Sequence, residues 1–443
     1  MTKPILTPPS GTRDFLPEES SFRSRVFSTV KTVFSLHGFD PFETPAFERL
    51  ETLSGKYGEE GEKLIYKILK RGEKAVSGEA DLALRYDLTV PTMRLYSRNR
   101  NKLPSIVKRY QIGPVWRADR PGRGRFREFY QCDVDVIGAR APLADIEVLL
   151  ALSGALKELG LAEFNIRLNS RSALRALMAA YGVSTGDQAI VLTVLDKLDK
   201  IGVTGVVDEL SRLAIDDEVI GELVADLQAA APEEVACARI QALEDGRAAL
   251  TEVTLISDYV RPFLGTNASI TVDPFLARGL DYYTGPIFEF VAKDSRGSIA
   301  GGGRYDNLSR LFMKDSVPVC GGSLGIERII LLLLAKQESN MKIRSGCYVT
   351  VWDDKSVASA LGLCNELRSN GVVADMDVEG GKLGRQLKIA DERGFRVVLV
   401  QGPDETAAGE IMVKDMASGE QRRVPHNGVV DVLRRILNEP SVS

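Results

Sequence analysis

The hydrophobic positions near the N-terminus recur at the spacing of an amphipathic helix. Within residues 18–37, the side chains of Phe22, Val26, Val30 and Phe34 lie four positions apart. Residues at this spacing share one face of an α-helix, which can then pack against a core. We therefore predict a long helix here, followed by an extended segment bounded by prolines, FDPFETPAFE.

Residues 80–138 contain short apolar runs of the kind that form strands. The runs that predict strands are LALRYDL, IVKRYQIGPVWR and REFYQCDVDVIG, and TVPTMRLYSR among them predicts a helix. Residues 143–160 predict a second helix, and FNIRLN predicts another strand.

Composition changes after about residue 170. The next stretch is rich in Ala, Leu, Val and acidic residues, has Pro232 as its only proline, and repeats helical patterns such as DEVIGELVADLQAA. Strand-like, glycine-rich sequence resumes after it. We therefore expect residues 172–258 to form a helical insertion that divides a sheet domain into residues 1–171 and 259–335.

The end of the chain has a different pattern. Residues 343–443 alternate strand patterns (CYVTVWD, VVADMDV and FRVVLVQG) with helical ones (SVASALGLCNELRSNG and GRQLKIADERG). Such alternation is typical of α/β domains. We expect an independent α/β domain with a largely parallel sheet.

Charge and composition exclude several classes of protein. Lys and Arg total 57 against 61 Asp and Glu, a formal net charge of -4, which excludes a protein that coats polyanions through its overall field. The longest apolar run, IERIILLLLA, is too short to span a bilayer, and the N-terminus lacks the pattern of a signal peptide. Five scattered cysteines without a CxxC pair indicate free thiols, and two histidines near opposite ends leave little for a zinc site or a Ser-His-Asp triad. We therefore expect a cytoplasmic protein that does not associate with membranes.

One short segment concentrates arginines. Residues 116–131 read WRADRPGRGRFREFYQ, which predicts a strand, a Gly/Pro turn and a second strand. Arginines on both limbs can fork onto phosphate oxygens, and Arg123, Arg125 and Arg127 would share one face of the second strand. The chain has neither a GxxxxGK[ST] nor a GxGxxG motif, so phosphates would have to be held in another way. A solvated basic hairpin explains this segment, taken alone, equally well.

Three further peptides contain glycine and polar residues that suit a ligand site. LARGLDYYTG places Arg278 near Tyr282 and Tyr283, whose hydroxyls need partners when buried, although paired aromatics more often simply pack. AGGGRYDNL places three glycines, which allow close approach to the backbone, before Tyr305, although a tight turn is the simpler explanation. GGSLGIERIILLLLA predicts a strand entering a helix with Arg328 near its start, where a surface ion pair is the alternative.

In order and spacing these peptides, with LRYDLTVP at residues 84–91, resemble the histidyl-tRNA synthetases, a family of class II aminoacyl-tRNA synthetases. GTRDFLPEES with the next helix and FETPAFE is similar to the first class motif, the dimer-forming element that contains Pro45. GPVWRADRPGRGRFREFYQ is similar to the second motif and GGSLGIERIILL to the third. LARGLDYYTG and AGGGRYDNL resemble the two peptides peculiar to the histidine enzymes, and the likeness covers essentially the whole chain.

The resemblance implies both a fold and an activity. The fold would be an α+β catalytic domain, built as the class II antiparallel sheet flanked by helices, with the helical insertion and a C-terminal α/β anticodon-binding domain. The family uses ATP with Mg²⁺ to convert L-histidine to histidyl-adenylate, releasing pyrophosphate, and then transfers the histidyl group to tRNA(His), releasing AMP. It also implies a homodimer, without a tightly bound organic cofactor or a fixed metal site.

The resemblance further assigns roles to individual residues. The residues implied in catalysis are Arg278, Arg117 and Arg328. Those implied in ATP binding are Arg117, Asp119, Arg125 and Arg328. Those implied in histidine binding are Asp87, Gln131, Asp135, Arg278, Tyr282, Tyr283 and Tyr305. The residues expected to meet the acceptor end of the tRNA are Arg120 and Arg123, and Arg127 keeps a structural role.

Some positions depart from the common bacterial pattern. Asp87, Asp119 and Asp135 stand where many bacterial relatives carry glutamate, and RPGRG differs from their glutamine-containing turn, so the preferred acceptor end stays open. In the C-terminal domain, Lys382 and its neighbours Arg385 and Lys388 are a candidate patch for tRNA, and a solvated helix face explains them equally well. Glu327 is a candidate for an indirect role near Mg²⁺.

A function of another class has the same fold. A regulatory relative, such as the regulatory subunit of ATP phosphoribosyltransferase, keeps the synthetase fold without aminoacylation. Members of that group usually lack the anticodon-binding domain and the catalytic arginines. This chain has both the sequence pattern of that domain and the arginines. A plain basic RNA-binding module leaves the tyrosine and glycine peptides unexplained.

Overall fold

The computed structural model describes residues 5–57, 61–122, 124–213, 215–278, 282–293, 295, 297–336 and 344–438. The chain divides into two compact units, residues 1–336 (unit 1) and 337–443 (unit 2). Within the described residues, no helix has both the length and the apolar character needed to cross a membrane.

Unit 1 is built around an eight-stranded sheet. Its strands are β1 (Asp40–Pro41), β5 (Val107–Trp116), β6 (Glu128–Ile137), β7 (Phe164–Ser170), β8 (Ser269–Val272), β9 (Pro286–Ala292), β10 (Ser298–Arg304) and β11 (Val319–Leu324). The strand order is β1-β5-β6-β11-β10-β9-β7-β8, and every pairing is antiparallel except β1 with β5 and β7 with β8 at the two edges. The expected antiparallel sheet is confirmed.

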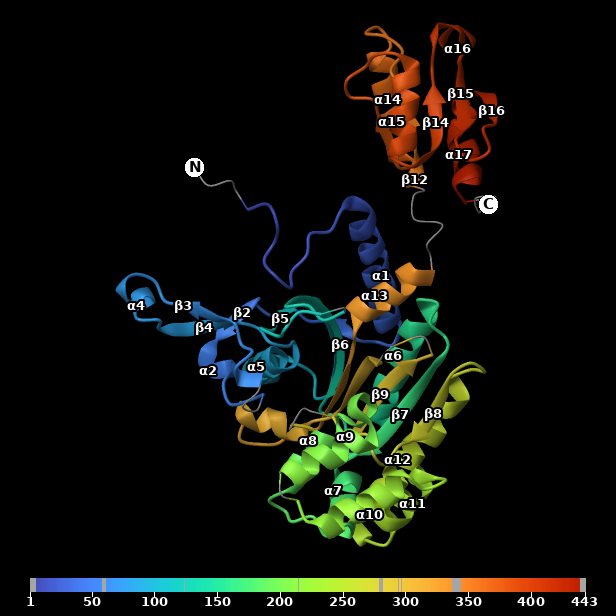
Figure 1. Cartoon of the computed structure of the whole chain (residues 1–443). Coiled ribbons are helices and arrows are strands. Elements are labelled where there is room, and N and C mark those ends of the chain that lie inside the picture. The colour runs from blue at the N-terminus through green and yellow to red at the C-terminus, as the bar shows by residue number, and fades with distance from the viewer. Residues whose placement is uncertain are drawn as a thin grey trace. The chain divides into compact units, whose positions relative to one another are not determined.

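Three helices, together with the end of the helical insertion, cover one face of this sheet (Figure 1). They are α1 (Pro17–Leu36), α6 (Leu143–Glu158) and α13 (Ile326–Lys336). The apolar stripe predicted for α1 is buried, with Phe34 and Val30 fully enclosed, and it packs into the same core as Phe288 and Phe290 of β9. The other face of β5, β6 and β11 is therefore free for polar residues.

The helical insertion appears as a group of helices at one end of unit 1 (Figure 1). Its members are α7 (Arg171–Ala180), α8 (Gln188–Leu195), α9 (Leu198–Arg212), α10 (Asp217–Leu227), α11 (Pro232–Gln241) and α12 (Glu244–Val260). Helix α12 packs against α7, β7 and β8, which ties the group to the sheet. The short 3₁₀ helices of unit 1 are η1 (Arg100–Lys102), η2 (Arg261–Phe263) and η3 (Asp306–Leu311).

A small three-stranded sheet with order β2-β4-β3 flanks the large one. Its strands are β2 (Phe47–Arg49), β3 (Lys67–Leu69) and β4 (Ala80–Leu84), and the helices in this part are α2 (Leu50–Leu53), α4 (Glu73–Val76) and α5 (Thr89–Asn99). The predicted helix TVPTMRLYSR is α5, and Asp87 lies in the turn that leads into it.

Unit 2 is a five-stranded sheet with order β13-β12-β14-β15-β16. Its elements are β12 (Arg344–Val349), α14 (Val357–Ser369), β13 (Ala374–Met376), α15 (Leu383–Glu392), β14 (Phe395–Val400), α16 (Pro403–Ala408), β15 (Glu410–Asp415), β16 (Gln421–Pro425), η4 (His426–Gly428) and α17 (Val429–Asn438). Strands β13, β12 and β14 are parallel, whereas β15 and β16 are antiparallel additions. The expectation of a largely parallel sheet is wrong for this edge, because β15 and β16 form an antiparallel hairpin, in which β16 buries only one residue and gives a weak apolar pattern.

Candidate active site

The polar face of the large sheet follows from the alternation of β6. Cys132, Val134 and Val136 point into the helix-covered core, so Gln131, Asp133 and Asp135 occupy the opposite face. The register with β5 places three residues directly across from them, namely Gly113 opposite Gln131, Gln111 opposite Asp133, and Arg109 opposite Asp135. On β11, the paired residues Ser323 and Gly321 add little bulk. The small residues Gly113 on β5 and Gly321 and Ser323 on β11 leave room beside these side chains.

A cavity of about 920 Å³ opens on this face. Six of the residues predicted for the site line it, namely Arg117, Asp119, Arg125, Gln131, Arg278 and Arg328. A cavity of this size is at the upper end of the range typical for small-molecule sites. Five of its lining residues are arginines from four separate peptides, which favours an anionic ligand with several charges.

The cavity arginines are held by short contacts to their surroundings. Arg117 Nε donates to the carbonyl of Tyr86 at 3.1 Å, and its guanidinium lies 4.4 Å from the Tyr86 ring centre. Arg125 Nη2 donates to Asp119 Oδ1 at 2.7 Å, and Arg328 Nη1 donates to the carbonyl of Ser298 at 2.7 Å. Each guanidinium keeps further N–H groups that can meet phosphate oxygens.

Arg278 reaches the cavity across β9 and β10. Its Nη1 donates to Glu289 Oε1 at 2.8 Å, and its Nε has no hydrogen-bond partner among the described residues. Burial alone would lower the pKa of Arg278, but the effects of the neighbouring Tyr283 and Glu289 side chains outweigh burial and raise that pKa. Arg278 therefore stays a cation inside the site.

The three glycines of AGGGRYDNL lie in β10, so the tight-turn interpretation is wrong. A side chain at Gly301 would overlap the guanidinium of Arg278, and one at Gly302 would lie 2.5 Å from the Cα of Gly322 in β11. The glycines thus make room for the guanidinium of Arg278 and for the neighbouring strand. Arg304, which ends β10, pairs with Asp145 at 2.6 Å and has a structural role.

The arginine-rich turn differs from the predicted hairpin in one respect. Strand β6 begins at Glu128, so the described residues from 117 to 127 lie in a loop with one bridge between Gly122 and Arg125, and Arg125 and Arg127 do not share a strand face. Arg120 is exposed on this loop, and Arg123 lies outside the described residues.

Arg127 is not among the residues that line the cavity. Its Nε donates to the carbonyl of Asp119 at 3.0 Å, its Nη1 donates to the carbonyl of Ser10, and its side chain packs on Gly11. The structural role predicted for this residue is consistent with these contacts.

The residues predicted for histidine binding are buried beside the cavity. Asp87 Oδ1 accepts hydrogen bonds from the Val90 amide at 3.0 Å and from the Tyr57 hydroxyl at 3.2 Å. Burial raises the pKa of Asp87, against the opposing effects of the Val90 amide and the positive charge of Arg117. A cationic group placed here would favour the ionised form and lower this pKa.

Asp135 makes two contacts on its polar face of β6. Its Oδ1 accepts from the Tyr305 hydroxyl, and its Oδ2 forms an ion pair with Arg109 Nη2. Burial raises the pKa of Asp135 to about 7, although the charge of Arg109 opposes this rise. This carboxyl group therefore titrates near neutral pH, which is typical of functional sites.

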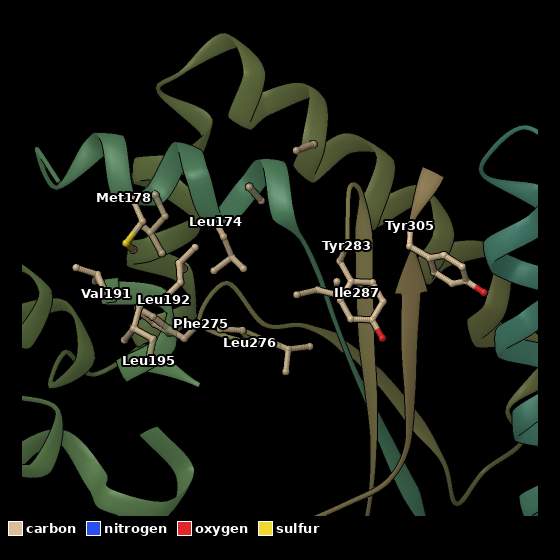
Figure 2. Close-up of a cluster of buried hydrophobic side chains, with 14 of the residues drawn as sticks. Leu174, Met178, Val191, Leu192, Leu195, Phe275, Leu276, Tyr283, Ile287 and Tyr305 are labelled. Carbon is tan, nitrogen blue, oxygen red and sulfur yellow. The ribbon is translucent and has the colours of Figure 1, made fainter. Parts of the chain in front are cut away.

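The tyrosines form one aromatic cluster. The ring centres of Tyr282 and Tyr283 are 5.0 Å apart, and that of Tyr305 lies 5.6 Å from Tyr282 and 6.4 Å from Tyr283. Figure 2 shows Tyr283 and Tyr305 at the edge of an apolar cluster that includes Leu174. The three rings therefore pack against one another, as expected for paired aromatic residues. The hydroxyl of Tyr305 also donates a hydrogen bond to the carboxylate of Asp135.

Two buried acceptors on this face have no donor. Gln131 Oε1 and Asp133 Oδ1 lack hydrogen-bond partners among the described residues. Burial also raises the pKa of Asp133 to about 6. Unpaired acceptors are costly to bury, so a ligand that supplies N–H donors fits here.

Sequence reasoning missed Asp133 and Arg109 as parts of the site. The signal for Asp133 was its position two residues from both Gln131 and Asp135, which puts the three on one strand face. The pairing of Arg109 with Asp135 depends on the register of β5 with β6, which the sequence alone does not specify.

Glu327 lies at the cavity wall, at the start of α13. Its carboxylate accepts from Arg23 Nη1 and Nη2, both at 2.7 Å, from Arg13, and from the Tyr130 amide at 3.3 Å. Burial raises the pKa of Glu327, but the bonds and charges of the two arginines outweigh burial and lower it. With both oxygens paired, Glu327 does not fit as a direct metal ligand. Across the described ranges, no group of three or more His, Cys, Asp or Glu residues is arranged to hold a metal ion.

The helical insertion also contributes to the cavity wall, which the sequence did not predict. The lining residues from α8, α9 and their junction are Leu195, Asp196, Leu198, Asp199 and Lys200. Arg167 of β7 donates to Asp199 Oδ2 and to Asp273 Oδ2, both at 2.5 Å, and so joins the insertion to the sheet.

The candidate patch of unit 2 is partly neutralised. Arg385 pairs with Glu379 and donates to the carbonyl of Gly380 at 3.0 Å, while Lys388 lies 3.6 Å from Glu392. These contacts leave the solvated-face interpretation as good as the tRNA one.

Comparison with known proteins gives matches over nearly the whole chain. A family model described as histidyl-tRNA synthetase matches residues 11–329, and one described as an anticodon binding domain matches residues 345–436. A histidine–tRNA ligase of Christiangramia forsetii is 36% identical, covering 96% of this chain and 98% of its own. One of Gloeobacter violaceus is 38% identical, covering 94% of this chain and 95% of its own.

Solved structures give the same picture. The histidyl-tRNA synthetase of Nostoc sp. PCC 7120 superposes with a TM-score of 0.83 at 29% identity, over 98% of this chain and all of its own. A Bacillus halodurans protein described as an ATP phosphoribosyltransferase regulatory subunit/histidyl-tRNA synthetase superposes with a TM-score of 0.73 at 24% identity, a likeness of fold alone. With family matches over both units, and with an arginine-lined cavity beside buried acceptors, the chain belongs to the histidyl-tRNA synthetase family.

Proposed function

We propose that this chain ligates L-histidine to tRNA(His) at the expense of ATP, through a histidyl-adenylate intermediate. The proposal rests on two different environments that lie next to each other in the site. One is a cavity lined by arginines, and the other is a set of buried acceptors, Gln131 Oε1 and Asp133 Oδ1, that have no donor among the described residues. A triphosphate suits the first, and an amino acid with an α-ammonium group and a ring N–H suits the second.

In the first step, a carboxylate oxygen of histidine attacks the α-phosphorus of ATP. The bond from this phosphorus to the bridging oxygen breaks, and pyrophosphate leaves with the electron pair. Arg117 and Arg278 meet the charge that builds on the α-phosphoryl oxygens, while Arg125 and Arg328 hold the outer phosphates. Catalysis of this kind depends on positioning and on fixed charges rather than on covalent help from the protein.

In the second step, a hydroxyl of the terminal ribose of tRNA attacks the carbonyl carbon of the adenylate, and AMP leaves. We assign Arg120 and Arg123 of the loop to the acceptor end, and unit 2 to the anticodon, in keeping with the family match of residues 345–436. Asp119, which holds Arg125, is assigned to the ATP site.

Mg²⁺ enters this scheme with the phosphates of ATP, where it would neutralise charge on the leaving pyrophosphate. Any role of Glu327 toward Mg²⁺ would be indirect, because both of its carboxylate oxygens already pair with Arg13 and Arg23. We also propose a homodimer, with Pro45 in the dimer-forming motif.

Histidine itself is assigned to the buried residues. Asp87 and Gln131 would receive the α-ammonium group, and Asp135 with Tyr283 would read the ring. Tyr282 and Tyr305 close the pocket. A site built on hydrogen bonds rejects analogues that leave its buried polar groups unpaired, by roughly 10⁴-fold in good cases.

The test is histidine-dependent exchange of pyrophosphate into ATP without tRNA, by the full chain, its Arg278→Ala variant and an Arg49→Ala control. Arg49 is an exposed surface residue whose side chain is 78% accessible. We expect exchange in the wild type and the control, and a loss of about 10²–10³-fold on Arg278→Ala. Histidine binding without exchange in the wild type would contradict the proposal and favour a regulatory relative.

A further inference from the structure

Arg109 is a fully buried cation behind the histidine pocket. It lies on β5 directly across from Asp135 on β6, and the guanidinium forms an ion pair with the Asp135 carboxylate. Its Nε and Nη1 have no hydrogen-bond partner among the described residues. A buried guanidinium with so few partners is costly, which calls for a reason beyond stability.

The surroundings of Arg109 contain more negative than positive groups. Asp133 lies on the same face of β6, Asp87 lies in the turn before α5, and both interact with the charge of Arg109. Desolvation raises the pKa of each of these carboxyl groups and that of Asp135. Arg109 opposes this rise in all three.

Asp135 is held from several directions. The groups that titrate or carry charge around it are Arg109 on β5, Asp133 on β6, Asp87 before α5, Cys320 on β11, and Tyr305 after β10. The Tyr305 hydroxyl fixes one oxygen and Arg109 the other, while Gly321 on β11 leaves the space that the carboxylate fills. Each oxygen keeps a lone pair for a further donor.

We propose that Arg109 is a positioning residue that keeps Asp135 ionised and oriented, so that this carboxylate accepts a ring N–H of the bound histidine. The proposal rests on the assignment of Asp135 to the histidine ring. It adds that the cation behind the pocket sets the pH range in which histidine is recognised. Asp133 acts in the opposite sense, because its negative charge favours the protonated form of Asp135.

The sign of the effect follows from charge. Removing the cation at residue 109 raises the pKa of Asp135, so tight histidine binding should begin at a higher pH. Removing the charge at residue 133 lowers that pKa, so tight binding should begin at a lower pH. Free histidine has the same ring pKa in every assay, so a shift between variants reports on the protein.

The experiment measures the KM for histidine and for ATP in pyrophosphate exchange, from about pH 5.5 to about pH 9, which brackets the ordinary titration of imidazole. The full-length variants are Arg109→Met, Arg109→Lys and Asp133→Asn. For Arg109→Met we expect the midpoint of the histidine KM profile to rise by about one pH unit or more, which raises the histidine KM at neutral pH by about 5-fold or more, with the ATP KM within ~2-fold. In Arg109→Lys the midpoint of the histidine KM profile should lie close to that of the wild type. In Asp133→Asn it should lie at a lower pH than in the wild type.

Several outcomes would overturn the proposal. An unmoved midpoint in both Arg109→Met and Asp133→Asn would do so, as would equal rises in the two KM values. If Arg109→Met fails to fold by circular dichroism, the near-isosteric Asp133→Asn decides the matter through the direction of its shift. Absence of exchange in the wild type would instead refute the proposed function.

Discussion

The hydroxyl of Tyr305 donates to Oδ1 of Asp135, although the two residues are 170 positions apart in the sequence. The bond spans β11, which separates the strand of Asp135 from the end of β10. It joins a peptide rich in glycine to the face of β6 that carries the buried acceptors. The glycine-rich strand β10 is therefore tied directly to the proposed histidine pocket.

Tyr305→Phe should weaken histidine recognition. The change removes a donor to a buried carboxylate and keeps the ring packing against Tyr283. A hydrogen bond to a charged group contributes about 1.5–3 kcal/mol, so we expect the KM for histidine to rise about 10–100-fold, with a smaller change for ATP. Tyr259→Phe, at a residue that is 56% exposed, is the matched control. Equal effects on the two substrates would mean that the hydroxyl only supports the fold.

Arg328→Ala should act mainly on ATP. Arg328 projects from the start of α13 into the cavity and touches only the Ser298 carbonyl among the hydrogen bonds found for its side chain. Loss of a charge-assisted contact to phosphate should raise the KM for ATP by about 10–100-fold. Pyrophosphate exchange measured at varied ATP and at varied histidine concentrations gives the two KM values separately, with Arg49→Ala as control. A larger rise in the KM for histidine than in the KM for ATP would show that Arg328 does not bind the phosphates.

Arg23→Ala should destabilise unit 1. The Arg23 and Glu327 side chains are 5% and 6% exposed, and removal of one partner of a buried pair costs about 3–5 kcal/mol. Urea denaturation in a Trp352→Phe background, where Trp116 is the remaining tryptophan, measures this unit alone. The exposed pair of Arg49 with Glu51 is the comparison, because Arg49→Ala should cost less than ~1 kcal/mol.

The same pair gives a pH dependence. The pKa of Glu327 is lower in the folded protein than its ordinary value. Its contribution to stability is therefore complete above the unfolded pKa of about 4.3, and is lost as the pH falls through the lower folded pKa. In Glu327→Gln this acid-dependent loss should shrink, measured as the free energy of unfolding from about pH 6 to about pH 3. An unchanged acid profile would show that other carboxylates dominate.

Gly302→Ala should separate β10 from β11. A Cβ at this position would lie 2.5 Å from the Cα of Gly322, and backbone atoms in a sheet centre have little room to move. We expect a loss of about 1–3 kcal/mol or more, with reduced exchange activity. Gly384→Ala on α15, where nothing lies within 4 Å of the new Cβ, should be neutral or stabilising by up to ~1 kcal/mol. Thermal melting of both variants checks the contrast.

Much of unit 1 was predictable because its helices and strands have strong apolar periodicity. The buried stripe of α1 and the alternation of β6 both appear as expected. The arginine loop was not, because the pattern predicts a second strand directly after the Gly/Pro turn, whereas Arg125 and Arg127 still lie in a loop that turns at Gly124, which has a positive φ of 74°. In unit 2, the hairpin of β15 and β16 was missed because an edge hairpin buries few residues.

By itself, the sequence determined the class of the fold and the family, and it predicted six of the residues that line the cavity, because local periodicity and short motifs act within one segment. The tertiary structure alone decided which of these residues meet. The pairing of Arg109 with Asp135 requires the β5–β6 register, the contact of Asp135 with Tyr305 requires β11 between β6 and β10, and the role of Gly301 requires Arg278 to cross its strand. Such contacts join residues distant in the chain, and their energies depend on burial that only the folded protein creates.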